Sequence, residues 1–288
     1  MLIDNLSQLA SASQRAVIIN VGTKLVSTLA LLSALRYSRM PVLLIDCEAK
    51  DGSFNHFDAL MHRYDFDLMK APLCSHGKTL DFLFERIQAD KLLLIDSDLE
   101  IHSGKVIEFC TEYIDEPTVF GSGFTDGPAW LMDPVFEPDG LRGALFSERP
   151  WMPLTLLKTG PVKEALQRGK SFAHFLLNNE YSVLPKFWGN VLRRITKRGP
   201  AKLRRNFNAL KPALVYYDTG AQIFEYLRYE KLMYFVGLPE PAHTRCVTHF
   251  WGVARHTLNP QDDLGAADFS KVDDLVRHRL ESVYHETF

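Results

Sequence analysis

Residues 91–98 read KLLLIDSD, and this stretch decides the expected fold of the N-terminal half. Four consecutive apolar side chains, Leu92 to Ile95, form a run of the length and character of a strand buried on both faces. Asp96, Ser97 and Asp98 follow at once and end the apolar run. The stretch therefore predicts an inner strand of a parallel sheet with two carboxylates at its carboxyl end.

Two earlier apolar runs have the same form. Residues 16–20 read AVIIN and residues 42–46 read VLLID, and the segment between them carries leucines at helical spacing, namely Leu25, Leu29, Leu32 and Leu35. A strand, a helix and a strand in this order favour a parallel pair joined by a crossover, which predicts an α/β fold. Ligands of such sheets bind beyond the carboxyl ends of the strands, where Asp46 and Asp96 are expected.

The acidic residues at these strand ends predict a cation site. Asp46, Asp96 and Asp98 would repel one another at one edge of the sheet unless a cation or hydrogen-bond donors stabilised them. A divalent metal that also contacts phosphate oxygens fits this edge, because hard cations prefer carboxylate and phosphate oxygens as ligands.

The order of these motifs resembles the GT-A glycosyltransferases, and family 2 in particular. Four apolar residues followed by Asp-x-Asp, at 92–98, resemble the hallmark of that fold, and residues 17–20, 42–46 and 51–53 resemble the opening of family-2 enzymes. The resemblance spans residues 15–105 and, more loosely, 144–256. It departs at residues 21–23, which lack the usual proline- and aromatic-containing turn. It implies a Rossmann-like sheet that binds a nucleotide sugar, followed by an α+β half on the acceptor side.

The resemblance also implies roles for single residues. Asp46 and Asn20 would contact the nucleotide, Asp96 would face the ribose or the metal through water, and Asp98 would bind the metal directly. The implied cofactor is Mn²⁺ or Mg²⁺, and the implied donor is a UDP- or GDP-linked sugar. Trp151 is a candidate for covering the apolar face of a sugar ring, although most tryptophans pack in cores.

Two acidic residues are candidates for the catalytic base. Asp218 lies in the sequence YYDTG, just before a predicted helix at 221. An inverting transfer needs a carboxylate that deprotonates the acceptor hydroxyl, and the resemblance places one near the start of a helix in this region. An ordinary N-cap is the alternative for Asp218. Glu148 is the second candidate.

His249, in the sequence THFWG, is a candidate for a further metal ligand. Some GT-A enzymes use a late histidine followed within a few residues by glycine, and an imidazole suits Mn²⁺. The alternative is a half-buried histidine that is hydrogen-bonded to backbone.

The second half of the chain has a different pattern. Glycine and proline are frequent in residues 121–143, which predicts hairpins or irregular β-structure, and a last helix is expected from Ser270. We expect two parts of one compact domain, a donor-binding half at 1–118 and an acceptor-binding, catalytic half at 119–288. Residues 4–13 predict a short N-terminal helix.

A basic segment, residues 186–211, lies in the second half. Nine Lys and Arg residues and no acidic residue lie between Glu180 and Asp218. Apolar residues alternate with the charges over 191–207, so a helix lying on an anionic membrane is one interpretation. A solvated helix face, or a site for an anionic acceptor, are the others.

Bulk properties exclude some other classes. The net charge of −2 argues against nucleic acid binding by the whole chain, and the four cysteines form no CxxC pair that would predict a zinc ribbon. The N-terminus lacks the apolar core of a signal peptide, so we expect a cytoplasmic protein, with peripheral contact at the inner face of a membrane as an option.

The sequence thus favours a glycosyltransferase, as in polysaccharide biosynthesis, with a glycan, a lipid-linked sugar or a protein as acceptor. Two alternatives stay open. One is a phosphatase of the haloacid-dehalogenase type that uses Asp96 and Asp98, and the other is a non-catalytic, membrane-associated protein with a glycosyltransferase-like fold.

Overall fold

The computed structural model describes residues 1–48, 50–125, 150–173, 175–178, 214–217, 219–238, 245–250, 253 and 269–287. Within them, an eight-stranded sheet has the order β1-β4-β3-β2-β5-β8-β7-β11. Its strands are β1 (Leu2–Ile3), β2 (Ala12–Asn20), β3 (Val42–Cys47), β4 (Asp67–Ala71), β5 (Ala89–Asp96), β7 (Val119–Thr125), β8 (Pro150–Lys158) and β11 (Tyr234–Gly237).

Two short ladders complete the β-structure. One pairs β6 (Leu99–Ile101) with β12 (Val247–His249), and the other pairs β9 (Phe175–Asn178) with β10 (Leu214–Tyr217). The helices are α1 (Lys24–Tyr37), α2 (Ser53–Leu60), α3 (His76–Arg86), α4 (Lys105–Glu112), α6 (Thr159–Gln167), α9 (Ala221–Glu225) and α12 (Phe269–Tyr284), with a 3-10 turn η1 (Leu6–Gln8) and a π-helical turn η3 (Tyr226–Glu230).

The strand directions confirm the predicted α/β class. β1, β4, β3, β2 and β5 are parallel, and β8 runs antiparallel to both β5 and β7. β7, β8 and β11 follow residue 118 in the chain but belong to the same sheet as β2, β3 and β5. The sheet that carries the Asp-x-Asp stretch is therefore built from both sequence halves.

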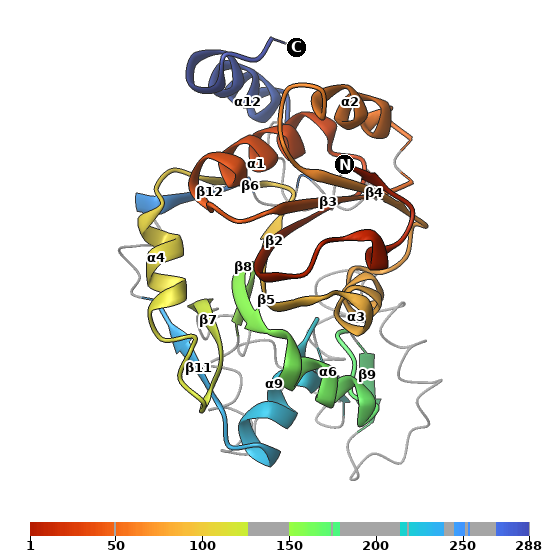
Figure 1. The fold of residues 1–288 in the computed structure, drawn as a ribbon, viewed down its shortest axis with the longest axis vertical. Helices are drawn as coiled ribbons and strands as arrows, with labels where there is room; N and C mark the ends of the chain where they lie inside the picture. Colours follow the sequence, from red (N-terminus) through yellow and green to blue (C-terminus); the bar gives the residue numbers. More distant parts are fainter. Residues whose placement is uncertain are drawn as a thin grey trace, which may run out of the picture.

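Helices cover both faces of this sheet (Figure 1). Alternate strand residues such as Ile18 and Leu93 belong to the hydrophobic core with α1, α2 and α4, whereas Val17 and Leu92 belong to the core with α3, α6 and α9. This alternation is why the inner strands are apolar throughout. α12 packs on α1 through a third apolar cluster.

The N-terminal prediction was wrong in part. Residues 4–13 do not form one helix: η1 covers three residues, and β2 already begins at Ala12. Asn5 and Gln8 form a reciprocal capping box that closes the short turn, and Ala12 pairs with Ala89 of β5. The capping box starts one helical turn, and the pairing of Ala12 with β5 prevents that turn from continuing as a helix. Among the described helices, none combines the length and apolar character of a membrane span.

Candidate functional site

The site begins where β5 ends. Asp96 is the last residue of β5, Ser97 and Asp98 form a turn, and β6 starts at Leu99. β6 pairs antiparallel with β12, which places His249 opposite Leu99. The N–H of Phe250 donates to the carbonyl oxygen of Asp98 at 2.8 Å. This small ladder is what brings a histidine from late in the chain next to the acidic turn.

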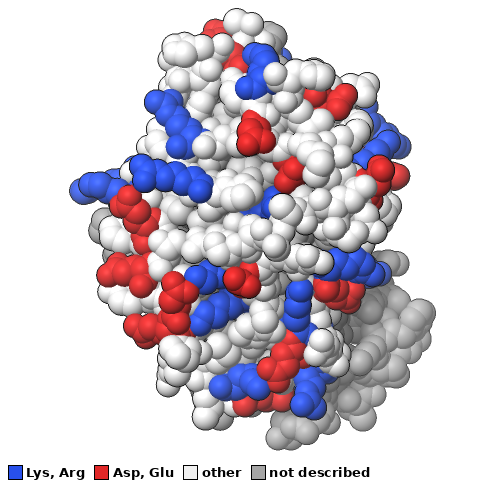
Figure 2. Space-filling view, viewed as in Figure 1, with Lys and Arg blue, Asp and Glu red and all other residues white. Residues whose placement is uncertain are grey.

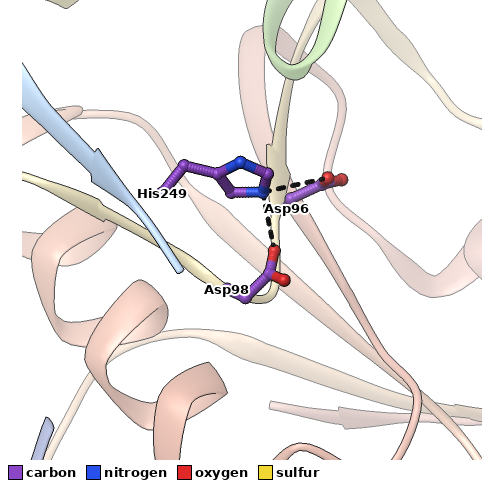
Figure 3. A group of neighbouring side chains, drawn as sticks. All are labelled: Asp96, Asp98 and His249. Carbon is purple, nitrogen blue, oxygen red and sulfur yellow. Dashed lines mark hydrogen bonds and ion pairs between the residues drawn. The ribbon is translucent and has the colours of Figure 1, made fainter. Parts of the chain in front are cut away.

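Asp96, Asp98 and His249 gather around a common point (Figure 3). Nε2 of His249 lies 3.0 Å from Oδ1 of Asp98 and 3.9 Å from Oδ2 of Asp96. One ligand atom from each residue lies within 4.8 Å of the other two. The Asp98 and His249 side chains are each 7% exposed, while Asp96 keeps 30% of its side chain exposed and is the one open to a ligand.

These distances fit a small divalent ion. In an octahedral site with bonds of about 2.1 Å, neighbouring ligand atoms lie roughly 3.0 Å apart and opposite ones roughly 4.2 Å apart. The 3.0 Å from His249 to Asp98 matches the first value, and the 3.9 Å from His249 to Asp96 lies between the two values. Two carboxylates and one imidazole suit Mn²⁺ better than Mg²⁺ or Ca²⁺, which prefer oxygen ligands alone.

The electrostatics of the turn point the same way. Burial and then the charge of Asp98 raise the pKa of Asp96, while His76 and His249 oppose that rise. A cation placed among these groups would lower the pKa of Asp96 again, because it stabilises both carboxylates in their charged forms. The sequence pattern does not predict His76, which lies at the start of α3; its place in the first turn of a helix that follows a parallel strand is the signal that could have identified it.

Asn20 and Asp46 lie on the neighbouring strand ends. Asn20 is opposite Asp46 in the β2–β3 pair, and Ile19 is opposite Asp96 in the β2–β5 pair. Nδ2 of Asn20 donates to Oδ1 of Asp46 at 2.5 Å, and both side chains are fully buried. The structure therefore brings Asn20, on the strand next to β5, together with Asp46, on the following strand of the sheet.

Asp51 forms the outer, exposed part of this edge, and residues 51–53 are the sequence signal that indicates it. Its carboxylate accepts from the N–H groups of Lys24 at 3.0 Å and Ser53 at 3.1 Å, and from the Ser53 hydroxyl. Burial opposes ionisation, but these hydrogen bonds lower the pKa of Asp51. An exposed carboxylate whose charged form is favoured is thus held next to Asp46 through their shared partner Ser53.

The remaining predicted residues are not placed here. Asp218, Glu148 and the basic segment 186–211 lie outside the described residues. Trp151 lies in β8, and its side chain is also outside the described part of the chain.

Comparisons with known proteins give fold similarity alone. No family model matches the sequence, and no curated protein matches it. Among solved structures, the chain is similar to the mannosyltransferase PcManGT from Pyrobaculum calidifontis in complex with GDP-Man and Mn²⁺, with 12% identity and a TM-score of 0.42 over 60% of this chain and 50% of that one.

Two other solved structures give similar values. TarS 1–349 from S. aureus in complex with UDP-GlcNAc is 13% identical, with a TM-score of 0.41 over 56% of this chain and 48% of that one. Glucosyl-3-phosphoglycerate synthase from Mycobacterium tuberculosis, in complex with Mn²⁺, UDP and phosphoglyceric acid, is 13% identical, with a TM-score of 0.41 over 52% and 57%. The chain thus spans about half the length of the structures that it resembles.

Proposed function

We propose that this chain is a metal-dependent glycosyltransferase that takes its sugar from a nucleotide-sugar donor. The observation that carries the proposal is the convergence of Asp96, Asp98 and His249 at the carboxyl ends of parallel strands, beside Asp46. A donor with a diphosphate group requires a metal site for the diphosphate and, beside it, a polar edge such as that of Asn20 and Asp46 for the nucleoside.

Each residue of the site has a proposed role. Asp98 and His249 hold Mn²⁺ or Mg²⁺, and Asp96 completes the set from its more exposed position. When bound, the ion neutralises the charge that develops on the diphosphate leaving group. Asp46 and Asn20 form the nucleoside side of the pocket, and Asp51 is the carboxylate with enough exposure to touch the base or ribose directly.

The acceptor side is proposed from the sequence alone. Asp218 takes the proton from the attacking acceptor hydroxyl in an inverting transfer, with Glu148 as the second candidate. Trp151 packs against a sugar ring. The acceptor is a glycan, a lipid-linked sugar or a protein, and residues 191–207 hold the enzyme on an anionic membrane.

Thermal-shift measurements with nucleotide sugars test the core of this proposal. We expect one UDP- or GDP-linked sugar to raise the melting temperature when Mn²⁺ is present and to have a much smaller effect with EDTA, since a ligand of the folded state stabilises it by mass action. Release of free nucleotide from the same donor would then report transfer or slow hydrolysis. The absence of any shift with the full set of common donors and Mn²⁺ would remove the proposal.

The acceptor-side roles have separate tests. Asp218→Asn should keep donor affinity and lose turnover; if turnover persists, Glu148→Gln is the next variant. Neutralising Arg193, Arg194, Lys197 and Arg198 together should reduce sedimentation with vesicles rich in phosphatidylserine, and unchanged sedimentation would argue for a solvated helix face.

A further inference from the structure

Behind the proposed site lies a cluster of buried polar side chains from five segments of the chain. Its members are Asn20 at the end of β2, Thr23 before α1, Ser27 in α1, Ser53 at the start of α2 and Ser97 in the acidic turn, and none is more than 5% exposed. Burying this many polar groups is costly unless they bond one another. Their hydrogen bonds form one continuous network.

Asn20 is the hub of this network. Its Nδ2 donates to Oδ1 of Asp46 at 2.5 Å and to Oγ of Ser53 at 3.0 Å. Its Oδ1 accepts from the N–H and the hydroxyl of Thr23, each at 3.1 Å, and from the hydroxyl of Ser27 at 2.8 Å. An amide group has two donors and two acceptor positions, so the bonds from Nδ2 and those to Oδ1 leave no position of the Asn20 amide unused.

The orientation of the Asn20 amide follows from its partners. The backbone N–H of Thr23 can only donate, so it must face the amide oxygen, and the Asp46 carboxylate accepts, so it must face the amide nitrogen. A flipped amide would place like groups against each other on both sides. Asn20 is therefore fixed in one orientation, between Asp46 and Ser53 on one side and the start of α1 on the other.

Thr23 extends the network to the acidic turn, residues 96–98. Its hydroxyl lies 2.7 Å from Oγ of Ser27 and 3.3 Å from Oγ of Ser97. Ser97 is the middle residue of the acidic turn, between the two proposed metal ligands. A path of hydrogen bonds thus runs from Asp46 through Asn20 and Thr23 to Ser97.

We propose that Asn20 and Thr23 are positioning residues that couple the nucleoside end of the donor pocket to its metal end. This inference rests on the proposed function. When a nucleoside binds, it orders the edge formed by Asp46 and Ser53, and this edge fixes Asn20 and Thr23. Thr23 then fixes the turn between Asp96 and Asp98 in the conformation that binds the metal. The coupling is reciprocal, so a metal ion tightens nucleoside binding by the same factor.

Nucleosides without phosphate are the probes that isolate this coupling. A nucleoside diphosphate would touch the ion directly, whereas uridine and guanosine have no phosphate to do so. We expect Mn²⁺ to raise the affinity of the better nucleoside by about fivefold in the wild-type protein, the lower end of typical coupling between sites. Titration calorimetry with and without Mn²⁺ measures this ratio.

Three variants separate coupling from simple loss of stability. Thr23→Val removes the hydroxyl but keeps the shape of the side chain and should bring the ratio close to one, while Thr23→Ser keeps the hydroxyl and should restore it. Thr28→Val is the matched control: Thr28 is also fully buried in α1, but its hydroxyl bonds the Lys24 carbonyl and His56 instead of the network. It should leave the ratio unchanged.

The outcomes distinguish this inference from the proposed function. If UDP or GDP binds with Mn²⁺ but the nucleoside and Mn²⁺ bind independently in the wild-type protein, the coupling is wrong and the function stands. A folded Thr23→Val variant that keeps the wild-type ratio also overturns the coupling. If the wild-type protein binds neither nucleoside nor nucleotide, the proposed function fails and the inference fails with it.

Discussion

Arg279 of α12 donates hydrogen bonds to the carboxylate of Glu100 in β6. Its Nε lies 3.2 and 3.1 Å from the two carboxylate oxygens, and its Nη2 lies 2.6 Å from Oε1. Tyr284 donates a further hydrogen bond to the same carboxylate at 3.2 Å. Glu100 is 1% exposed and lies two residues after Asp98, in the strand that pairs with β12. The C-terminal helix therefore supports the ladder that carries His249.

Removing Arg279 should destabilise the fold. Arg279→Ala leaves the Glu100 carboxylate buried without its charged partner, and we expect a loss of about 2–4 kcal/mol in the free energy of unfolding, measured by urea denaturation. Arg86→Ala is the matched control, because Arg86 and Glu85 form an ion pair that is about half exposed on each side, and its loss should cost under about 0.5 kcal/mol. Equal effects of the two variants would contradict a supporting role for Arg279.

Asp98→Asn should weaken metal binding. The change keeps the size of the side chain but removes its charge and one metal-ligating oxygen, so we expect Mn²⁺ affinity to fall at least tenfold, roughly the effect of removing 1.4 kcal/mol of binding energy. His249→Ala should act in the same direction. The control is Asp115→Asn, since that carboxylate is 81% exposed and pairs with Lys91, near the start of β5, whereas Asp96 is the last residue of that strand. Electron paramagnetic resonance of free Mn²⁺ measures all three, and unchanged affinity in both site variants would exclude the proposed ligands.

A methyl group at Gly77 should disrupt the packing of α3. A Cβ there would lie 2.4 Å from the Phe172 carbonyl oxygen and 2.5 Å from the Ala173 Cα, and both are backbone atoms that cannot turn away. We expect Gly77→Ala to lower the free energy of unfolding by roughly 1–3 kcal/mol.

Gly160→Ala gives the matched comparison for that variant. Gly160 lies in α6, and a Cβ there meets no atom within 4 Å. Alanine favours the helix more than glycine does, so this variant should be neutral or more stable by up to about 1 kcal/mol. If Gly77→Ala is as stable as Gly160→Ala, the close approach of α3 to residues 172–173 is wrong.

Thiol labelling should separate the cysteines by burial and pKa. Burial raises the pKa of Cys110 to about 12, and burial followed by the effect of Cys74 raises the pKa of Cys47 to about 12. A raised thiol pKa leaves very little of the reactive thiolate at pH 8, and these two side chains are also shielded from reagent. Cys74 is exposed. In the native protein, iodoacetamide at pH 8 should modify Cys74 well before Cys47 or Cys110, as read by peptide mass spectrometry.

Loss of this order would show that β3 or α4 opens readily. The denatured protein is the control, because all four cysteines should then react at similar rates.

The sequence by itself determined the parallel core and the acidic edge. Apolar runs that end in Asp46 and Asp96 can be buried only as inner strands, and helical leucine spacing between the first two runs requires a crossover. Local periodicity is enough for these features, because each depends on residues close together in the chain. It was not enough for residues 4–13, where pairing of Ala12 with Ala89 decides the structure.

Only the tertiary structure decided which side chains face one another at that edge. His249 reaches Asp98 because β12 pairs with β6, and Asn20 becomes a hub because Thr23, Ser27 and Ser53 converge on it from separate elements. Arg279 finds Glu100 only when α12 packs on α1. These contacts join residues far apart in the chain, and their geometry depends on long-range packing that no local pattern of sequence encodes.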